Sequence, residues 1–291
     1  MSSATAVMAA SARWSVQGIW MVVKRTLTAL GMALIGLPAI YFGGFFYFLV
    51  IEVLVAGAAW EYVRLFRLVN LRPSMIVTVG GVAILLAIRM FYAPAAWPVL
   101  AGLTLLVITV HLIAYEKGRD QAAQDATVTL SGLIYLGWIG AYLLDLRNQP
   151  NGTWWLMLSL FPVFVADSIA YFIGIRFGKH RMSPRLSPKK SWEGYVAGVI
   201  SGPFAGAGFA WLAAQAGGPP MNLWAAALLG LILAALTPLG DLGESLFKRQ
   251  AGVKDSSNVF PGHGGFFDRI DSWLWAAVIG FYFIQFSVSI P

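Results

Sequence analysis

Residues 222–240 read NLWAAALLGLILAALTPLG, a run without one charged side chain. A helix needs about 20 mostly apolar residues to cross the hydrocarbon core of a bilayer. Similar runs recur along the chain, which is 58% hydrophobic and 11% charged, whereas soluble domains carry about 25% charged residues. Because helices satisfy their own backbone groups in lipid, the sequence predicts an all-α, polytopic bundle of transmembrane helices, without room for a soluble domain of ordinary size.

The apolar runs predict about nine spans, each close to the length that a bilayer requires. They cover residues 27–43, 45–63, 75–93, 96–115, 126–145, 153–175, 195–215, 222–240 and 272–290. Residues 1–23 lack the early positive charge and the cleavage pattern of a signal peptide. We therefore expect this segment to be a mobile or interfacial tail.

The positions of the lysines and arginines predict the orientation. All but two of the 20 fall before the first predicted span or in the connections after the second, fourth, sixth and eighth; the exceptions are Arg89 and Arg147. Since positively charged loops stay in the cytoplasm, the N-terminus should be cytoplasmic and the C-terminus outside. The same distribution indicates that the net charge of +7 serves topology and anionic head groups rather than nucleic acid. The absence of cysteine excludes disulfides and thiolate nucleophiles.

Several acidic residues lie at or inside the apolar runs. A charged side chain at bilayer depth costs about 2.5–3.5 kcal/mol, so each one is a candidate functional residue. The alternative for an isolated acid is a carboxylate that reaches water at a helix end or a buried partner of an arginine. We adopt this alternative for Glu52 and Asp145. The candidates that remain are Asp167, Asp241, Asp268 and Asp271.

Residues 241–271 read DLGESLFKRQAGVKDSSNVFPGHGGFFDRID. On a helix, Asp241, Ser245 and Lys248 share one face, and Asp268 and Asp271 share a face of the next helix. A glycine-rich turn beside lysine, arginine and histidine separates them. Mg²⁺ commonly binds one or two carboxylates together with substrate phosphates, and lysine and arginine neutralise the other phosphate oxygens. This stretch therefore indicates a metal and phosphate site.

The whole string resembles the signature of the phosphatidate cytidylyltransferases (CDP-diacylglycerol synthases), in which S-x-x-K-R, K-D, H-G-G and D-R-x-D follow in fixed order. The matching positions are Ser245, Lys248, Arg249, Lys254, Asp255, Pro261, His263, Gly264, Gly265, Asp268, Arg269 and Asp271. Upstream, residues 165–194 are similar to a second stretch of that family, D-[ST]-x-A-Y-x-x-G followed by S-P-K-K-[ST]-W-E-G. The resemblance is strong over about residues 160–275.

The resemblance implies that CTP and phosphatidate react to give CDP-diacylglycerol and pyrophosphate, with Mg²⁺ as cofactor and a second, monovalent cation left open. The lipid phosphate should attack the α-phosphorus in line, so catalysis is mainly positioning and charge neutralisation. Asp241 and Asp268 are the expected leading metal ligands, and Asp271 is an outer or second-ion candidate. The expected catalytic set is Asp241, Ser245, Lys248, Arg249, Lys254, Asp255, His263, Asp268, Arg269 and Asp271.

Two of these residues keep an alternative. Arg269 either binds phosphate or forms a structural ion pair with an aspartate, and His263 either donates to a phosphate or holds the loop. For Asp167, the alternative to substrate binding is an interhelical hydrogen bond. For the residues between 189 and 193, the alternative is a solvated basic loop whose positive charge only sets the membrane topology. The expected substrate-binding set is Asp167, Tyr171, Lys189, Lys190, Ser191, Glu193, Gly264 and Gly265.

We expect one integral membrane unit, with N-terminal membrane helices in residues 24–150 and catalytic helices with cytoplasmic loops in residues 151–291. A bacterial inner membrane is expected, with the site facing the cytoplasm and in contact with membrane lipids. Small-residue faces such as GVISGPFAGAG at residues 198–208 allow close packing within the chain or in a homodimer. The rival functions are a polyprenol or phytol kinase, a cytidylyltransferase for another lipid phosphate, and a cation-coupled transporter.

Overall fold

The computed structural model describes residues 26–257, 259–260 and 264–289, and most of these residues are helical. This confirms the predicted all-α class, while the predicted tail at residues 1–23 lies outside the described residues. A first helix spans Thr26–Phe42. The later helices are α2 (Gly44–Leu68), α3 (Met75–Phe91), α4 (Ala96–Glu116), α5 (Ala122–Gly132), α6 (Tyr142–Asn148), α7 (Gly152–Phe177), α8 (Trp192–Gln215), α9 (Leu223–Leu236), α10 (Pro238–Gln250) and α11 (Phe267–Ser289).

Length and hydropathy support membrane insertion. In the described part of the chain, six helical segments are long and apolar enough to cross a membrane: Gly44–Leu68, Ala93–Glu116, Ala122–Asn148, Gly152–Phe177, Trp192–Gln215 and Leu223–Gln250. Thr26–Phe42 and α3 are apolar but shorter. Helix α11, with 23 residues, covers the ninth predicted span but is not one of the six. The chain is thus an integral membrane protein, and the count of nine spans stays a prediction.

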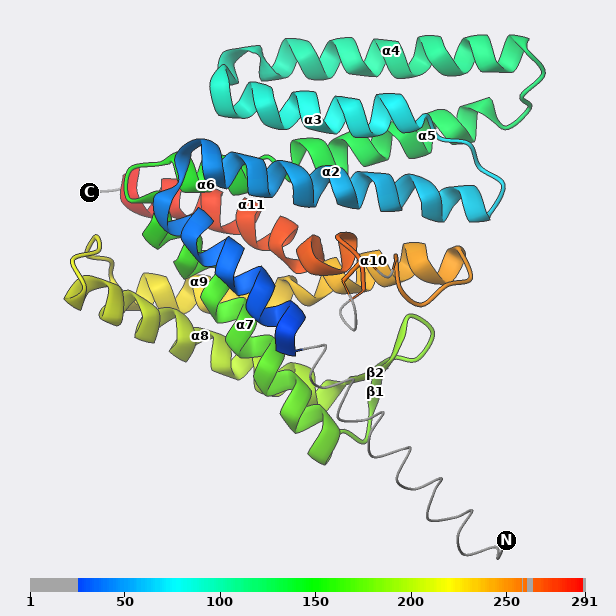
Figure 1. The fold of residues 1–291 in the computed structure, drawn as a ribbon. Helices are drawn as coiled ribbons and strands as arrows, with labels where there is room; N and C mark the ends of the chain where they lie inside the picture. Colours follow the sequence, from blue (N-terminus) through cyan, green and yellow to red (C-terminus); the bar gives the residue numbers. More distant parts are fainter. Residues whose placement is uncertain (1–25, 258, 261–263, 290–291) are drawn as a thin grey trace, which may run out of the picture.

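The connections fall at two ends of the bundle, as Figure 1 shows. The α2–α3 and α4–α5 connections, helix α10 and the segment between α7 and α8 lie toward one end. The α3–α4, α6–α7 and α8–α9 connections and the C-terminal end of α11 lie toward the other. The predicted basic connections within the described residues therefore share one end. The charge pattern predicted this separation of loops.

Three local features differ from the predicted spans. Residues 126–145 form no single regular helix, because a π-helical segment, Leu133–Trp138, separates α5 from α6. The predicted span at 222–240 does not stop there, since α10 continues the helical path to Gln250. Within the basic loop after α7, β1 (Arg181–Ser183) and β2 (Ser187–Ser191) form an antiparallel pair that the sequence analysis did not predict.

Glycines bring α8 and α9 into close contact. A Cβ atom added to Gly202 would lie 2.4 Å from the carbonyl oxygen of Gly230, and one added to Gly206 would lie 2.2 Å from that of Ala226. Such approaches are available only to residues without a side chain. The predicted small-residue face thus packs within the chain, against α9.

The two acids to which we gave no function behave differently. Asp145 forms an ion pair with Arg89, as the arginine-partner interpretation predicts. Glu52 of α2 has a buried Oε2 atom that lacks a hydrogen-bond partner among the described residues. The structure therefore supplies the expected arginine partner for Asp145, and no such partner for Glu52 in the described ranges.

Candidate active site

Three carboxylates from α10 and α11 converge. Asp241, Glu244 and Asp271 each offer one oxygen, and these three atoms all lie within 4.8 Å of one another. Glu244 and Asp271 are buried. The helices approach closely at Gly240, where an added Cβ would lie 2.5 Å from the carbonyl oxygen of Asp271. The sequence places Asp241 and Glu244 one helical turn apart, so α10 presents both acids to α11.

The donor chemistry of this cluster fits a hard cation. Oxygen atoms of carboxylates are the ligands that Mg²⁺ prefers. The Oε1 atom of Glu244 is buried and has no hydrogen-bond partner within the described ranges. An ionised oxygen in that position is costly unless a positive charge or a donor compensates it. The cluster therefore has the residues to hold a divalent ion.

Lys248 separates this cluster from Asp268. Its buried Nζ atom lies 2.7 Å from Glu244 Oε2 and 2.6 Å from Asp268 Oδ1. Asp268 Oδ2 also accepts hydrogen bonds from the Ser256 hydroxyl at 2.6 Å and from the Gly265 amide at 2.9 Å. Both oxygens of Asp268 thus already have donors.

The converging acids overlap only partly with the ligands that the sequence analysis expected. Asp241 and Asp271 meet, and Glu244 joins them although it was not selected. Asp268 is not one of the three in the cluster, and its role as a metal ligand stays a prediction. The string DLGES contained the signal for Glu244, because a residue three positions after Asp241 shares its face of a helix.

Two further expected residues, one in α7 and one in the hairpin, interact with Asp241 of the cluster. Lys190 of β2 forms an ion pair with Asp241, and its Nζ atom also lies 3.5 Å from the carbonyl oxygen of Pro238. Asp167 of α7 is within electrostatic reach of both Lys190 and Asp241. Tyr171, one turn farther along α7, is instead 64% exposed and packs its ring against Phe172.

Other expected residues around the hairpin have local contacts. The Ser191 hydroxyl caps α8 by accepting from the Gly194 amide at 3.2 Å. Glu193 Oε1 lies 2.6 Å from His180 Nδ1, and the His180 amide donates to the same carboxylate. Lys189 is exposed. These contacts fasten the hairpin to the start of α8, and the sequence analysis had given His180 no role.

Arg249, at the end of α10, donates to the Leu186 carbonyl oxygen at 3.2 Å and to that of Val253 at 3.0 Å. It therefore links the hairpin to α10. Lys254 and Asp255 are exposed, and Ser245 is buried.

The rest of the signature loop surrounds Asp268. Gly264 has a φ of +79°, and an added Cβ would lie 2.6 Å from Asp268 Oδ2. A Cβ on Gly265 would overlap with the carboxylate of Glu61, a residue of α2 that the sequence analysis missed. Arg269 has a buried Nε atom without a hydrogen-bond partner in the described part of the chain. His263 and Pro261 lie outside the described residues.

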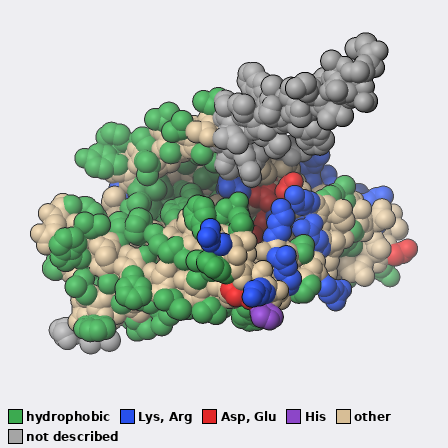
Figure 2. Space-filling view, turned by 90° about the horizontal axis from the view of Figure 1, so that it is seen from below, with side chains coloured by type: hydrophobic (Ala, Val, Ile, Leu, Met, Phe, Trp, Pro, Cys, Tyr) green, Lys and Arg blue, Asp and Glu red, His purple; other side chains and the backbone are tan. Residues whose placement is uncertain are grey.

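Charged side chains gather beside the apolar surface of the bundle. On the face in Figure 2, lysine and arginine side chains surround a few acidic ones, while hydrophobic side chains cover much of the remaining surface. Charged and apolar side chains thus lie next to each other on this face of the bundle.

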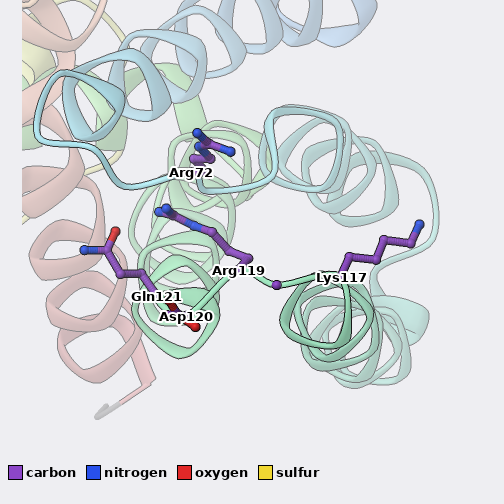
Figure 3. A pocket seen from close by; sticks show the side chains of 6 residues that line it. Arg72, Lys117, Arg119, Asp120 and Gln121 are labelled. Atoms are coloured by element: carbon purple, nitrogen blue, oxygen red, sulfur yellow. The ribbon is translucent and has the colours of Figure 1, made fainter.

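A second charged depression lies between the α2–α3 and α4–α5 connections. This cavity of about 470 Å³ is lined by Arg72, Lys117, Gly118, Arg119, Asp120 and Gln121. Lys117 points away from Arg72 and Arg119 in Figure 3. Arg119 donates to Asp125 at 2.7 Å, and this hydrogen bond raises the pKa of the guanidinium group. The charge of Arg119 is thus already compensated, and these residues do not converge on one point.

The fold and the site define an integral membrane protein with a carboxylate and lysine centre. A model of the cytidylyltransferase family matches residues 23–287. The chain is 35% identical over 272 residues to the phosphatidate cytidylyltransferase of Pseudomonas aeruginosa, and this match covers 89% of the chain and 94% of the relative. It is 31% identical over 258 residues to the phosphatidate cytidylyltransferase of Staphylococcus haemolyticus, and this match covers 86% of the chain and 94% of the relative. The chain belongs to the cytidylyltransferase family.

Proposed function

We propose that the chain transfers the cytidylyl group of CTP to phosphatidate, forming CDP-diacylglycerol and releasing pyrophosphate, at the carboxylate cluster between α10 and α11. The observation that supports this proposal best is the convergence of Asp241, Glu244 and Asp271 beside Lys190 and Lys248. The names of the relatives supply the acceptor, phosphatidate, and the transferred cytidylyl group. The resemblance of residues 241–271 to the family signature points to the same reaction.

Asp241, Glu244 and Asp271 would hold Mg²⁺, with Asp268 as a further candidate ligand. When bound there, the ion would neutralise charge on the α-phosphate and on the leaving pyrophosphate. Lys248 keeps Glu244 and Asp268 at fixed positions through its two ion pairs. The oxygen donors of the same group of acids would also suit a second, monovalent cation.

The lysines and arginines supply the charge that a triphosphate requires. Lys190 reaches the cluster from the hairpin, and Arg249 links that hairpin to α10. Binding at these positions would align the α-phosphorus with a phosphate oxygen of the lipid, so that the bond from the α-phosphorus to the leaving pyrophosphate breaks as the new phosphoanhydride bond forms. Catalysis then depends on orientation and on electrostatic stabilisation, without a protein nucleophile.

The central test is an assay of the purified protein with labelled CTP and phosphatidate, with Mg²⁺ omitted and then restored. We expect labelled CDP-diacylglycerol and pyrophosphate only when the ion is present. Transfer of a single phosphate to a lipid alcohol would support the kinase alternative. Phosphatidate can be replaced by another lipid phosphate in the same assay to define the acceptor.

A metal titration tests the role of Asp268. If Asp268 is a ligand, Asp268→Asn should raise the Mg²⁺ concentration that gives half-maximal rate. If Asp268 only fixes Lys248, kcat should fall while that concentration stays the same. The matched variant is Asp271→Asn, which alters a member of the cluster and should shift the Mg²⁺ requirement in either case.

We also propose that nine helices span a bacterial inner membrane, with the basic end and the site in the cytoplasm. Because the chain has no cysteine, single introduced cysteines report sidedness. Asp120→Cys at the basic end should react only with reagents on the cytoplasmic side, and Ala216→Cys at the other end only from outside. The reverse labelling would overturn the orientation, and crosslinking of the same variants tests a homodimer.

A further inference from the structure

One buried carboxylate outside the family signature contacts the signature loop. Glu61 of α2 is 0% exposed, and its partners lie at least 195 residues later in the chain. Its Oε2 atom accepts from the Ser256 hydroxyl at 2.8 Å and from the Phe267 amide at 2.9 Å. Its Oε1 atom accepts from the Phe266 amide at 3.0 Å and from the Ser257 hydroxyl. The middle of the loop and the start of α11 thus meet on one side chain.

The chemistry of this contact suits a fixed anchor. Glu61 has no ion pair within the described ranges, so neutral donors must compensate its charge. Phe266 and Phe267 lie at the start of α11, where free amides and the helix dipole favour a negative charge. Hydrogen bonds to an ionised acceptor are also stronger than those between neutral groups. The carboxylate therefore holds the first turn of α11 in place.

Ser256 connects this anchor to the site. Its hydroxyl lies 2.8 Å from Glu61 Oε2 and 2.6 Å from Asp268 Oδ2, and its amide also donates to Asp268. A hydroxyl carries one proton, so it donates to one of the two carboxylates at a time. Ser257 contacts Glu61 but has no contact with Asp268 among the hydrogen bonds of the described residues. Of the two neighbouring serines, Ser256 therefore links Glu61 to Asp268, whereas Ser257 contacts Glu61 without such a link.

We propose that Glu61 is a positioning residue, which acts through Ser256 and the first turn of α11 to place Asp268 and Asp271 opposite Lys248 and the acids of α10. This inference rests on the proposed function of the cluster. It makes the site composite: the C-terminal helices supply the reacting groups, and α2 of the N-terminal half fixes their spacing. A residue that only stabilises the fold would lack this link to turnover.

The test compares Glu61→Gln, Ser256→Ala and Ser257→Ala in the purified full-length protein with CTP, phosphatidate and Mg²⁺. We expect Glu61→Gln to lower kcat by about 10- to 100-fold at saturating substrates, because displacements of about 1 Å can cost that much. The KM values for CTP and phosphatidate should change far less. Ser256→Ala should lower kcat more than Ser257→Ala does.

A double variant tests whether the effect of Glu61 on kcat depends on Ser256. If Glu61 acts through Ser256, then adding Ser256→Ala to Glu61→Gln should lower kcat by less than the product of the two single effects. The matched control is Asp125→Asn, which removes another buried carboxylate of the N-terminal half, bound to Arg119 and to the Arg72 amide. It should lower the melting temperature without lowering kcat of the folded fraction.

Several results would overturn the proposal. One such result is a kcat of Glu61→Gln within about twofold of the wild type. Another is a loss of total activity that the lowered melting temperature explains in full, as expected for Asp125→Asn. If Glu61→Gln does not accumulate, equal kcat values for Ser256→Ala and Ser257→Ala would have the same consequence. An inactive wild type would instead refute the proposed function, so the two failures are distinguishable.

Discussion

Two aspartates of the N-terminal half and the acid cluster of the C-terminal half are compensated in different ways. In the N-terminal half, Asp145 pairs with Arg89, and Asp125 pairs with Arg119 and accepts from the Arg72 amide at 2.6 Å. In the C-terminal half, three acids converge, and one oxygen of Glu244 has no partner in the described part of the chain. Asp145 and Asp125 are thus each balanced by an arginine of their own, whereas the three acids of the cluster share Lys190 and Lys248.

This difference separates structural acids from candidate catalytic acids. A buried ion pair is satisfied by its partner and needs nothing from solution. A group of acids with too few cations keeps an unfavourable charge that a metal ion can relieve. Lys190 and Lys248 pair with members of the group, but they also lie where a triphosphate would need positive charge. The property that indicates function here is thus the convergence of incompletely compensated acids, because Glu52 also has an oxygen without a partner in the described ranges but belongs to no such group there.

The largest expected effect is the difference in kcat between Asp241→Asn and Asp145→Asn. Asp241→Asn removes a proposed ligand and the partner of Lys190, so kcat should fall by about 100-fold or more. Asp145→Asn lies outside the cluster, so kcat of the folded protein should stay within about twofold. Initial rates at saturating CTP, normalised to folded protein in the membrane, measure both. Near-normal turnover of Asp241→Asn at limiting Mg²⁺ would remove it from the ligand set.

The next effect concerns stability. The side chains of Arg89 and Asp145 are 11% and 14% exposed, and Arg89 also lies 4.7 Å from the centre of the Trp138 ring. Asp145→Asn leaves the guanidinium without its counter-charge, which should lower the free energy of unfolding by about 3 kcal/mol. Denaturant unfolding in detergent micelles measures this.

Removing both charges gives the control for that prediction. The double variant Arg89→Met with Asp145→Leu should be more stable than Asp145→Asn, because two apolar side chains leave no uncompensated charge. Equal stability of the double variant and Asp145→Asn would show that the ion pair is not what stabilises this region.

In the carboxylate cluster, removal of one charge should raise the stability of the protein, whereas at Asp145 it should lower it. Glu244→Gln keeps an oxygen for Lys248 and offers an amide donor to the neighbouring acids, so it relieves repulsion among the three. With Mg²⁺ chelated, its melting temperature should exceed that of the wild type by a few degrees. Added Mg²⁺ should raise the melting temperature of the wild type more than that of the variant, because it binds the folded wild type more tightly.

The matching control is Glu52→Gln, which neutralises another acid in an apolar helix. Its melting temperature should not depend on Mg²⁺ differently from that of the wild type. If Glu244→Gln melts below the wild type in chelator and responds equally to Mg²⁺, no divalent ion binds at the cluster.

The sequence predicted what depends on local periodicity. Apolar runs located the helices, and the i, i+4, i+7 spacing of Asp241, Ser245 and Lys248 predicted their common helix. These predictions succeed because helix formation and face assignment depend on neighbours within a few turns.

The sequence did not predict contacts between distant segments. In the sequence, Glu61 does not differ from any other acid near the end of an apolar run. Its partners are known only once α2 and α11 lie together. The β1–β2 pair was missed because its strands are short and carry the lysines and arginines of a basic loop. Glu244 is different, since its spacing from Asp241 was visible and was not used.

The smallest expected effect locates the edge of the candidate site within the hairpin. Lys189 and Lys190 are neighbours in β2, so their side chains point to opposite faces; Lys190 pairs with Asp241, whereas Lys189 is exposed. Lys190→Ala should lower kcat as well as kcat/KM. Lys189→Ala should leave kcat unchanged and raise the KM for one substrate by less than about tenfold, since exposed charge pairs contribute about 1 kcal/mol or less. Steady-state rates with each substrate varied in turn measure both. An unchanged KM for both substrates in Lys189→Ala would assign that lysine to membrane topology, and the site would then end at Lys190.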